Sequence, residues 1–154
     1  MTILEIDLNK LEKNYLSLRK RLNPHSKMIG VIKANAYGGV SGPIAERLVE
    51  MGIEALAVAY TEEGVQLRKL GIKIPLLVFY PQVLNFRTLI HNDLEPVLYS
   101  KWSWEKFKEA LVEEKKSDYP IHIKYNTGLN RIGFHPEETE WVLEQLKDPS
   151  FKLK

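Results

Sequence analysis

The stretch Met28-Ile29-Gly30-Val31-Ile32-Lys33-Ala34-Asn35-Ala36-Tyr37-Gly38-Gly39 joins an apolar run to a lysine and a loop of small residues. The run 28–32 is typical of a fully buried strand. Lys33 would then stand where the strand ends and a βα loop begins, the edge at which α/β proteins assemble active sites. The two glycines let the backbone approach a ligand closely. A lysine at a strand end often does no more than reach solvent. The role of Lys33 must therefore be inferred from the rest of the sequence.

Composition is that of one ordinary globular domain. The chain has 154 residues, of which 44% are hydrophobic and 27% charged. A net charge of +2 provides no polycation for nucleic acid or a membrane surface. The lack of cysteine excludes disulfides, thiolate zinc sites and a cysteine nucleophile. The first residues lack a signal-peptide pattern and no apolar run reaches membrane-spanning length, so we expect a cytoplasmic protein.

Apolar runs alternate with segments of helical periodicity along the chain. Strands are predicted over residues 3–6, 28–32, 55–59, 74–80, 94–99, 121–124 and, at the end of the chain, 151–154. Helices are predicted over 8–22, capped by Asp7 or Asn9, over 42–52, over 61–71, capped by Thr61, over 84–90, over 100–113, capped by Ser100, and from 136 onward.

This alternation is the pattern of right-handed βαβ units on a parallel sheet. No strand is followed by a GxGxxG or GxxxxGK[ST] phosphate loop, and the chain stops as though within a unit, which argues against a complete doubly wound sheet. A (β/α)8 barrel typically needs about 250 residues. We therefore expect an α/β fold that is a partial (β/α)8 TIM barrel, comprising its first five to six βα units.

A barrel gathers the residues that follow its strands onto one face. Lys33 and Tyr37 would come from the first such loop, Tyr60 from the second, and Lys124 and Arg131 from the fifth. Two lysines and an arginine without neighbouring carboxylates favour an anionic ligand such as a phosphate or a carboxylate. A partly desolvated lysine near other cations is also a usable amine nucleophile. A Schiff base between a lysine and an aldehyde cofactor is the natural interpretation.

Two motifs resemble those of the alanine racemase family. The segment Lys33-Ala34-Asn35-Ala36-Tyr37-Gly38 resembles the family's pyridoxal-phosphate attachment motif, and Lys124-Tyr125-Asn126-Thr127-Gly128-Leu129-Asn130-Arg131-Ile132-Gly133-Phe134 resembles its second signature. Weaker similarities occur in the family's order at residues 5–8, 57–59, 62–64 and 93–96. Residues 1–154 thus resemble the N-terminal part of an alanine-racemase-type barrel, without the C-terminal barrel half and the β domain.

The resemblance implies a role for four residues. Lys33 would hold pyridoxal 5'-phosphate through a Schiff base and act as base or acid on one face of the substrate Cα. Tyr37 would hydrogen-bond the cofactor phosphate, and Arg131 would lie near the phenolic oxygen. Lys124 matches a position that is often carbamylated and then holds that arginine by a charge-assisted pair. The cofactor acidifies Cα, so that the proton leaves one face and returns on the other.

The activity that the resemblance implies is interconversion of L- and D-alanine for peptidoglycan synthesis. The parent enzyme would be a homodimer whose second base, a tyrosine, lies in the C-terminal part, so the isolated chain would be inactive. Two alternatives stay open: a racemase-like enzyme for serine or another amino acid, and a non-catalytic module for cofactor binding or interaction. No metal is expected, because no two histidines share ligand spacing.

Three residues depart from the family pattern. Gly39 replaces a histidine after the attachment motif, which alters the loop behind the cofactor lysine. Asn126 replaces an aspartate and removes a negative charge beside Arg131. Leu129 replaces a methionine, a change that keeps the volume. His122, within the fifth predicted strand, is expected to be a structural histidine with satisfied hydrogen bonds.

Overall fold

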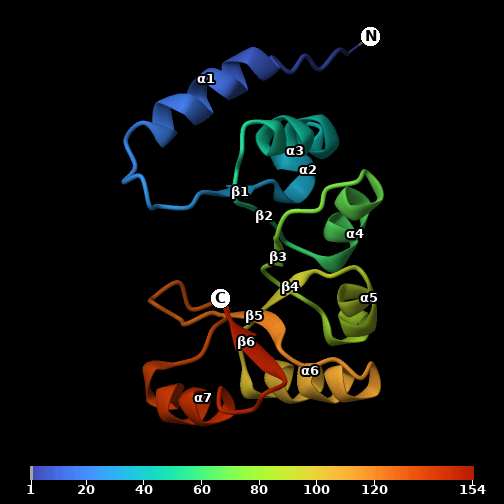
Figure 1. The fold of residues 1–154 in the computed structure, drawn as a ribbon, viewed down its shortest axis with the longest axis vertical. Helices are drawn as coiled ribbons and strands as arrows, with labels where there is room; N and C mark the ends of the chain where they lie inside the picture. The colour runs from blue at the N-terminus through green and yellow to red at the C-terminus, as the bar shows by residue number, and fades with distance from the viewer. Residues whose placement is uncertain (1) are drawn as a thin grey trace.

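The computed structural model describes residues 2–154 and forms one curved sheet of six parallel strands in chain order (Figure 1). The strands are β1 (Ile29–Val31), β2 (Ala55–Val58), β3 (Leu76–Val78), β4 (Glu95–Leu98), β5 (Tyr119–Ile123) and β6 (Phe151–Leu153). The helices are α1 (Leu8–Arg19), α2 (Lys33–Gly38), α3 (Ser41–Glu50), α4 (Thr61–Lys69), α5 (Phe86–His91), α6 (Lys101–Glu113) and α7 (Thr139–Gln145), with 3₁₀ turns η1 (Val83–Asn85) and η2 (Pro136–Glu138). The predicted α/β fold, a partial barrel of parallel βα units, is confirmed.

The two faces of the sheet carry different side chains because successive residues of a strand point to opposite faces. Most of the core lies between the sheet and the helices, and the strands contribute to it chiefly Leu56, Val58, Leu76, Val78 and Leu98. The opposite face carries a small separate cluster of Ala55, Ala57 and Leu77, against which Phe79 packs. This is the inner, concave face of the curved sheet. The small side chains of Ala55 and Ala57 on β2 leave space there.

The prediction that the first strand is fully buried is wrong. Ile29 is 50% exposed and Val31 is 38% exposed. The strand β1 is an edge strand of the sheet, and within residues 2–154 nothing covers the inner face of these two side chains. Gly30 and Ile32 point the other way, toward the core, where Gly30 lies close to Ile53 and Leu56.

The N-terminal segment differs from its prediction in two ways. Residues 3–6 form no strand and are exposed, because no strand in the described part of the chain pairs with them. The helix α1 begins as predicted, with the Asp7 carboxylate accepting hydrogen bonds from the amides of Asn9 (3.0 Å) and Lys10 (3.1 Å). It ends at Arg19, however, and Tyr15 is its only buried residue. No helix within residues 2–154 combines the length and apolarity needed to span a membrane.

Helix caps fix the entry of the chain into α4 and α6. Ser100 caps α6 as predicted and accepts a hydrogen bond from the Ser103 amide at 3.1 Å. The predicted cap Thr61 is instead the first residue of α4, where it is buried. Glu63 caps this helix by accepting from the Tyr60 amide at 3.0 Å, because its longer side chain reaches back over the first turn.

Arg68 binds the end of α4 to two neighbouring loops. Its guanidinium donates to the carbonyls of Ile72 and Ile74 at 2.8 Å each, and to those of Asn92 and Asp93 at 3.1 and 2.8 Å. The Arg68 guanidinium can bind all four carbonyls at once because it carries five N–H donors in one plane.

We expect Arg68→Lys to destabilise the fold by about 2 kcal/mol, because a lysine cannot reach all four of these carbonyls. Urea denaturation would measure the change. The exposed neighbour Lys69 has no hydrogen-bond partner in the described residues, so Lys69→Ala is the control and should alter stability by less than about 0.5 kcal/mol. Equal losses in both variants would contradict the bridging role of Arg68.

Asp148 joins the turn before β6 to α6. Its carboxylate lies 2.5 Å from Lys108 Nζ and accepts a hydrogen bond from the Ser150 amide at 2.9 Å. Lys108 first, and then Ser150, lower the pKa of Asp148 to about 2. In the unfolded chain the pKa of an aspartate is about 3.9.

This shift predicts a dependence of stability on pH. The folded pKa lies below the unfolded one, so the contribution of Asp148 is complete above pH ~4 and disappears as the pH falls toward ~2. Because Lys108 is half exposed, solvent screening limits the contribution to about 1 kcal/mol. The stability difference between the wild type and Asp148→Asn should therefore shrink over this range in acid denaturation curves. A difference that stays constant would show that the ion pair contributes nothing.

Candidate active site

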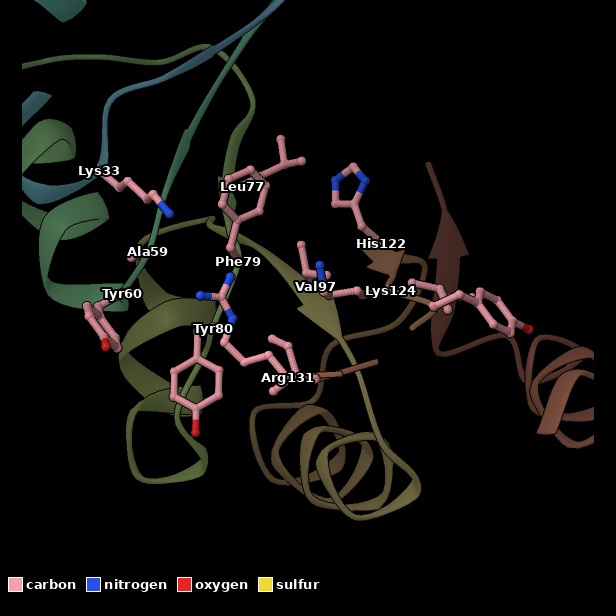
Figure 2. A pocket seen from close by; sticks show the side chains of 13 residues that line it. Lys33, Ala59, Tyr60, Leu77, Phe79, Tyr80, Val97, His122, Lys124 and Arg131 are labelled. Carbon is pink, nitrogen blue, oxygen red and sulfur yellow. The ribbon is translucent and has the colours of Figure 1, made fainter. Parts of the chain in front are cut away.

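A cavity of about 830 Å³ opens at the carboxyl ends of β2 to β5 and beside Lys33, which follows β1 (Figure 2). Lys33, Lys124 and Arg131 line it, as the sequence predicted for the strand ends. Figure 2 shows Lys33 reaching in from one side and Lys124 and Arg131 from the other. No aspartate or glutamate belongs to the lining, and within residues 2–154 none of the three cations forms an ion pair. The cavity is therefore suited to an anionic ligand.

Strand register explains why these cations share one cavity. Val31 pairs with Ala57, and Lys33 follows β1 after Ile32, which is buried in the core, so that Lys33 lies at the carboxyl end of the strand and lines the cavity. Lys124 likewise follows β5, in which His122 pairs with Val97 of β4. Ala59, which also lines the cavity, has a small side chain that leaves room for a ligand.

The segment after Lys33 is a left-handed turn and not an ordinary loop. Ala34, Asn35, Ala36 and Tyr37 all have φ between 52 and 59°. The Asn35 side chain fastens the turn, donating to the Gly39 carbonyl at 2.7 Å and accepting from the Ser41 amide at 2.9 Å. Left-handed backbone costs a non-glycine residue roughly 1–2 kcal/mol, so the sequence carries no local signal for it.

Tyr37 is the one predicted site residue that the structure does not bring to the cavity. Its side chain lies on the left-handed turn, is 68% exposed and does not belong to the lining. The proposed contact between Tyr37 and a phosphate therefore stays a prediction.

Asn126 organises the loop that returns Arg131 to the cavity. Its side-chain oxygen accepts hydrogen bonds from the amides of Gly128 (3.2 Å) and Asn130 (2.9 Å), and its nitrogen donates to the Asn130 side chain at 2.8 Å. Its backbone amide donates to the Phe134 carbonyl at 2.8 Å, which closes the loop. The uncharged asparagine thus has a clear structural role and leaves the positive charge of Arg131 unneutralised.

His122 lines the cavity and is paired with a carboxylate. Its Nε2 lies 2.7 Å from Glu95 Oε2, and both side chains are mostly buried. The expectation of a satisfied structural histidine agrees with this contact. Sequence reasoning did not identify Glu95 as the partner, although the β4–β5 register places it on the same inner face. The described residues contain no group of three His, Cys, Asp or Glu side chains that could hold a metal.

Three tyrosines form an aromatic row along the rim, and sequence reasoning noted only the first. Tyr60 meets Tyr80 edge-on at 6.0 Å between ring centroids, and Tyr80 stacks on Tyr99 at 5.4 Å. Burial, and then the proximity of Tyr80, raise the pKa of Tyr99. The signal was available, because each tyrosine follows one of three consecutive strands within two residues. Tyr60 and Tyr80 also line the cavity.

The sequence of the chain is similar to that of known alanine racemases. The family profile described as "Alanine racemase, N-terminal domain" matches residues 6–154. The chain is 38% identical to an alanine racemase of Methanococcus maripaludis, over 88% of this chain and 36% of that relative. It is 35% identical to an alanine racemase of Sorangium cellulosum, over 97% of this chain and 41% of that relative.

Solved structures agree with these matches. An alanine racemase structure from Clostridium difficile superposes with a TM-score of 0.90 at 32% identity, over 96% of this chain and 39% of that one. The chain therefore spans about two-fifths of the length of these relatives. Strand order, the lysine at the end of β1 and these matches agree: the chain belongs to the alanine racemase family, in which it matches the N-terminal domain.

Proposed function

We propose that this chain provides the cofactor-binding part of a pyridoxal-phosphate-dependent alanine racemase. The observation that carries the proposal is that Lys33, in the position of the attachment motif, faces one cavity together with two further unpaired cations. A small amino acid is the substrate. Supply of D-alanine for peptidoglycan, a cytoplasmic location and a homodimeric parent belong to the same proposal and rest on family membership.

The residues that line the cavity suit this cofactor. Pyridoxal phosphate presents an aldehyde, a phenolic oxygen and a phosphate, and so combines one electrophile with several negative oxygens. The Lys33 amine would bind the aldehyde carbon, and Arg131 would bind the phenolic oxygen. Ala59 leaves space for a planar ring. In the bound state the cofactor supplies an electron sink that acidifies the substrate Cα.

The side chains of this chain would then perform two tasks. Lys33 Nζ takes the proton from the face of Cα that it reaches and returns a proton to that face. Lys124 positions Arg131. As an ammonium it would repel the guanidinium on the same side of the cavity, whereas carbamylation by carbon dioxide would convert it to an anion that accepts hydrogen bonds from Arg131. The unpaired state of both side chains fits such a modification.

Hydrogen exchange at Cα tests the proposed chemistry. The 154-residue chain would be incubated with pyridoxal phosphate in D₂O, separately with L-alanine and with D-alanine, and deuterium at Cα would be measured by mass spectrometry. A single base reaches one face only, so exchange with retention is expected for one enantiomer.

The remaining outcomes separate the alternatives. Faster exchange of serine than of alanine would favour the serine alternative. Cofactor bound to Lys33 without exchange of any amino acid would favour the non-catalytic alternative, and no exchange and no binding would contradict the proposal.

A further inference from the structure

Glu63 contacts the segment that carries Lys33, in addition to capping its own helix. One carboxylate oxygen, Oε2, accepts hydrogen bonds from the amides of Ala59 at 2.7 Å and Tyr60 at 3.0 Å. The other oxygen, Oε1, accepts one from the Ala34 amide at 2.6 Å. Ala34 lies 29 residues away in sequence, and its amide belongs to the peptide bond that it forms with Lys33. A single carboxylate thus joins the segment after β1 to the segment after β2.

Among residues 2–154, no other hydrogen bond connects the left-handed turn to a segment so distant in sequence. The Ala36 amide donates to the Ile32 carbonyl at 3.0 Å and the Gly39 amide to the Ala36 carbonyl at 3.4 Å, and the Asn35 side chain bonds to the Gly39 carbonyl and the Ser41 amide. Within the described chain these bonds stay inside residues 32–41, whereas Glu63 belongs to α4. Four successive non-glycine residues at positive φ are held only when their surroundings over-determine them. Glu63 supplies that external constraint, and it does so at the peptide bond next to Lys33.

We propose that Glu63 is a positioning residue for Lys33. By holding the Lys33–Ala34 peptide plane, the carboxylate fixes the direction in which the Lys33 side chain leaves the backbone, so that its amine stays in the cavity. The positional part of this inference stands on the hydrogen bonds alone, and its consequence for cofactor attachment rests on the proposed function. Glu63 itself does not line the cavity.

Glu63→Gln is the sharpest substitution, because both oxygens of the carboxylate accept from N–H groups. A glutamine of nearly the same size has one oxygen and one NH₂ group, and an NH₂ cannot accept. It must give up either the Ala34 bond or the Ala59 and Tyr60 bonds. Glu62→Gln is the matched control: Glu62 lies in the same first turn and its only hydrogen bond in the described chain is to the Asn85 side chain.

Amide exchange in the 154-residue chain without cofactor tests the position of the turn. Ala34 is exposed, so Glu63 is what protects its amide. Loss of a charge-assisted hydrogen bond should speed exchange of the 33–37 segment about tenfold in Glu63→Gln, while Glu62→Gln leaves it unchanged. Exchange of this segment that is equal in the wild type, in Glu63→Gln and in Glu63→Asp would overturn the inference. Glu63→Asp, which keeps the charge but is too short to span both segments, should also lose protection.

Covalent capture tests the consequence for Lys33. The wild type and the variants would be treated with pyridoxal phosphate, reduced with borohydride and mapped by peptide mass spectrometry, well below their unfolding temperatures. We expect the adduct at Lys33 to fall about tenfold in Glu63→Gln and to persist in Glu62→Gln. An undiminished adduct in Glu63→Gln would overturn the positioning role. Absence of the adduct in the wild type would contradict the proposed function instead, and amide exchange would then decide the position of the turn by itself.

Discussion

Replacing Lys33 with alanine is expected to lower Cα hydrogen exchange of alanine by about a thousandfold, to the level of free pyridoxal phosphate. A positioned acid–base group contributes about 10²–10⁴ in rate, and the same substitution removes the amine that would hold the cofactor. The measurement is deuterium incorporation at Cα in D₂O with the preferred alanine enantiomer.

The matched control is Lys27→Ala. Lys27 is exposed and precedes β1, so it is a lysine near the opposite end of the same strand. This variant should keep the exchange rate of the wild type. Lys33 forms no side-chain hydrogen bond or ion pair within residues 2–154, so Lys33→Ala should change the free energy of unfolding by less than about 0.5 kcal/mol. Equal loss of exchange in both variants, or an unfolded Lys33→Ala, would contradict the assignment.

Replacing Trp104 with alanine is expected to reduce the free energy of unfolding by about 3–5 kcal/mol, the cost of truncating a fully buried aromatic side chain. Trp104 of α6 is completely buried. Its ring contacts Phe151 of β6, Trp141 of α7 and Phe134, with centroid distances of 4.9, 5.8 and 6.4 Å. It therefore joins the last strand and helix to the rest of the sheet.

Two further substitutions make this prediction specific. Trp102 lies on the same helix and is 56% exposed, so Trp102→Ala should cost less than about 0.5 kcal/mol. Trp104→Phe should cost clearly less than Trp104→Ala, because it keeps an aromatic ring and removes an indole N–H that is buried without a partner among the described residues. Similar losses for Trp102→Ala and Trp104→Ala in urea denaturation would contradict the central position of Trp104.

The strand ends were predictable because their signals are local. Buried strands such as β2 and β3 are short apolar runs that can be recognised in the sequence, and the period of two gives the face that each side chain of a strand occupies. Because a barrel gathers the residues that follow its strands onto one face, the sequence alone assigns Lys33, Lys124 and Arg131 to one rim. The same reasoning failed for Ile29, because the apolar character of a strand does not reveal that the strand lies at an edge.

The contacts that could not be predicted from the sequence join residues that are distant in the chain. The hydrogen bond from Ala34 to Glu63 and the contact of Glu95 with His122 require the register of neighbouring units. The left-handed turn contains no glycine before Gly38, so residue type gave no warning of positive φ. Residues 3–6 alternate like a strand, but a strand also needs a neighbour to pair with.

The central claim is that the fold places Lys33 as a cofactor-binding amine in a cationic cavity. Reduction of the wild-type chain with borohydride after treatment with equimolar pyridoxal phosphate, followed by peptide mapping, tests it most directly. We predict one adduct per chain, located on Lys33. Adducts spread over the exposed lysines, or located on Lys124 with Lys33 unmodified, would contradict it.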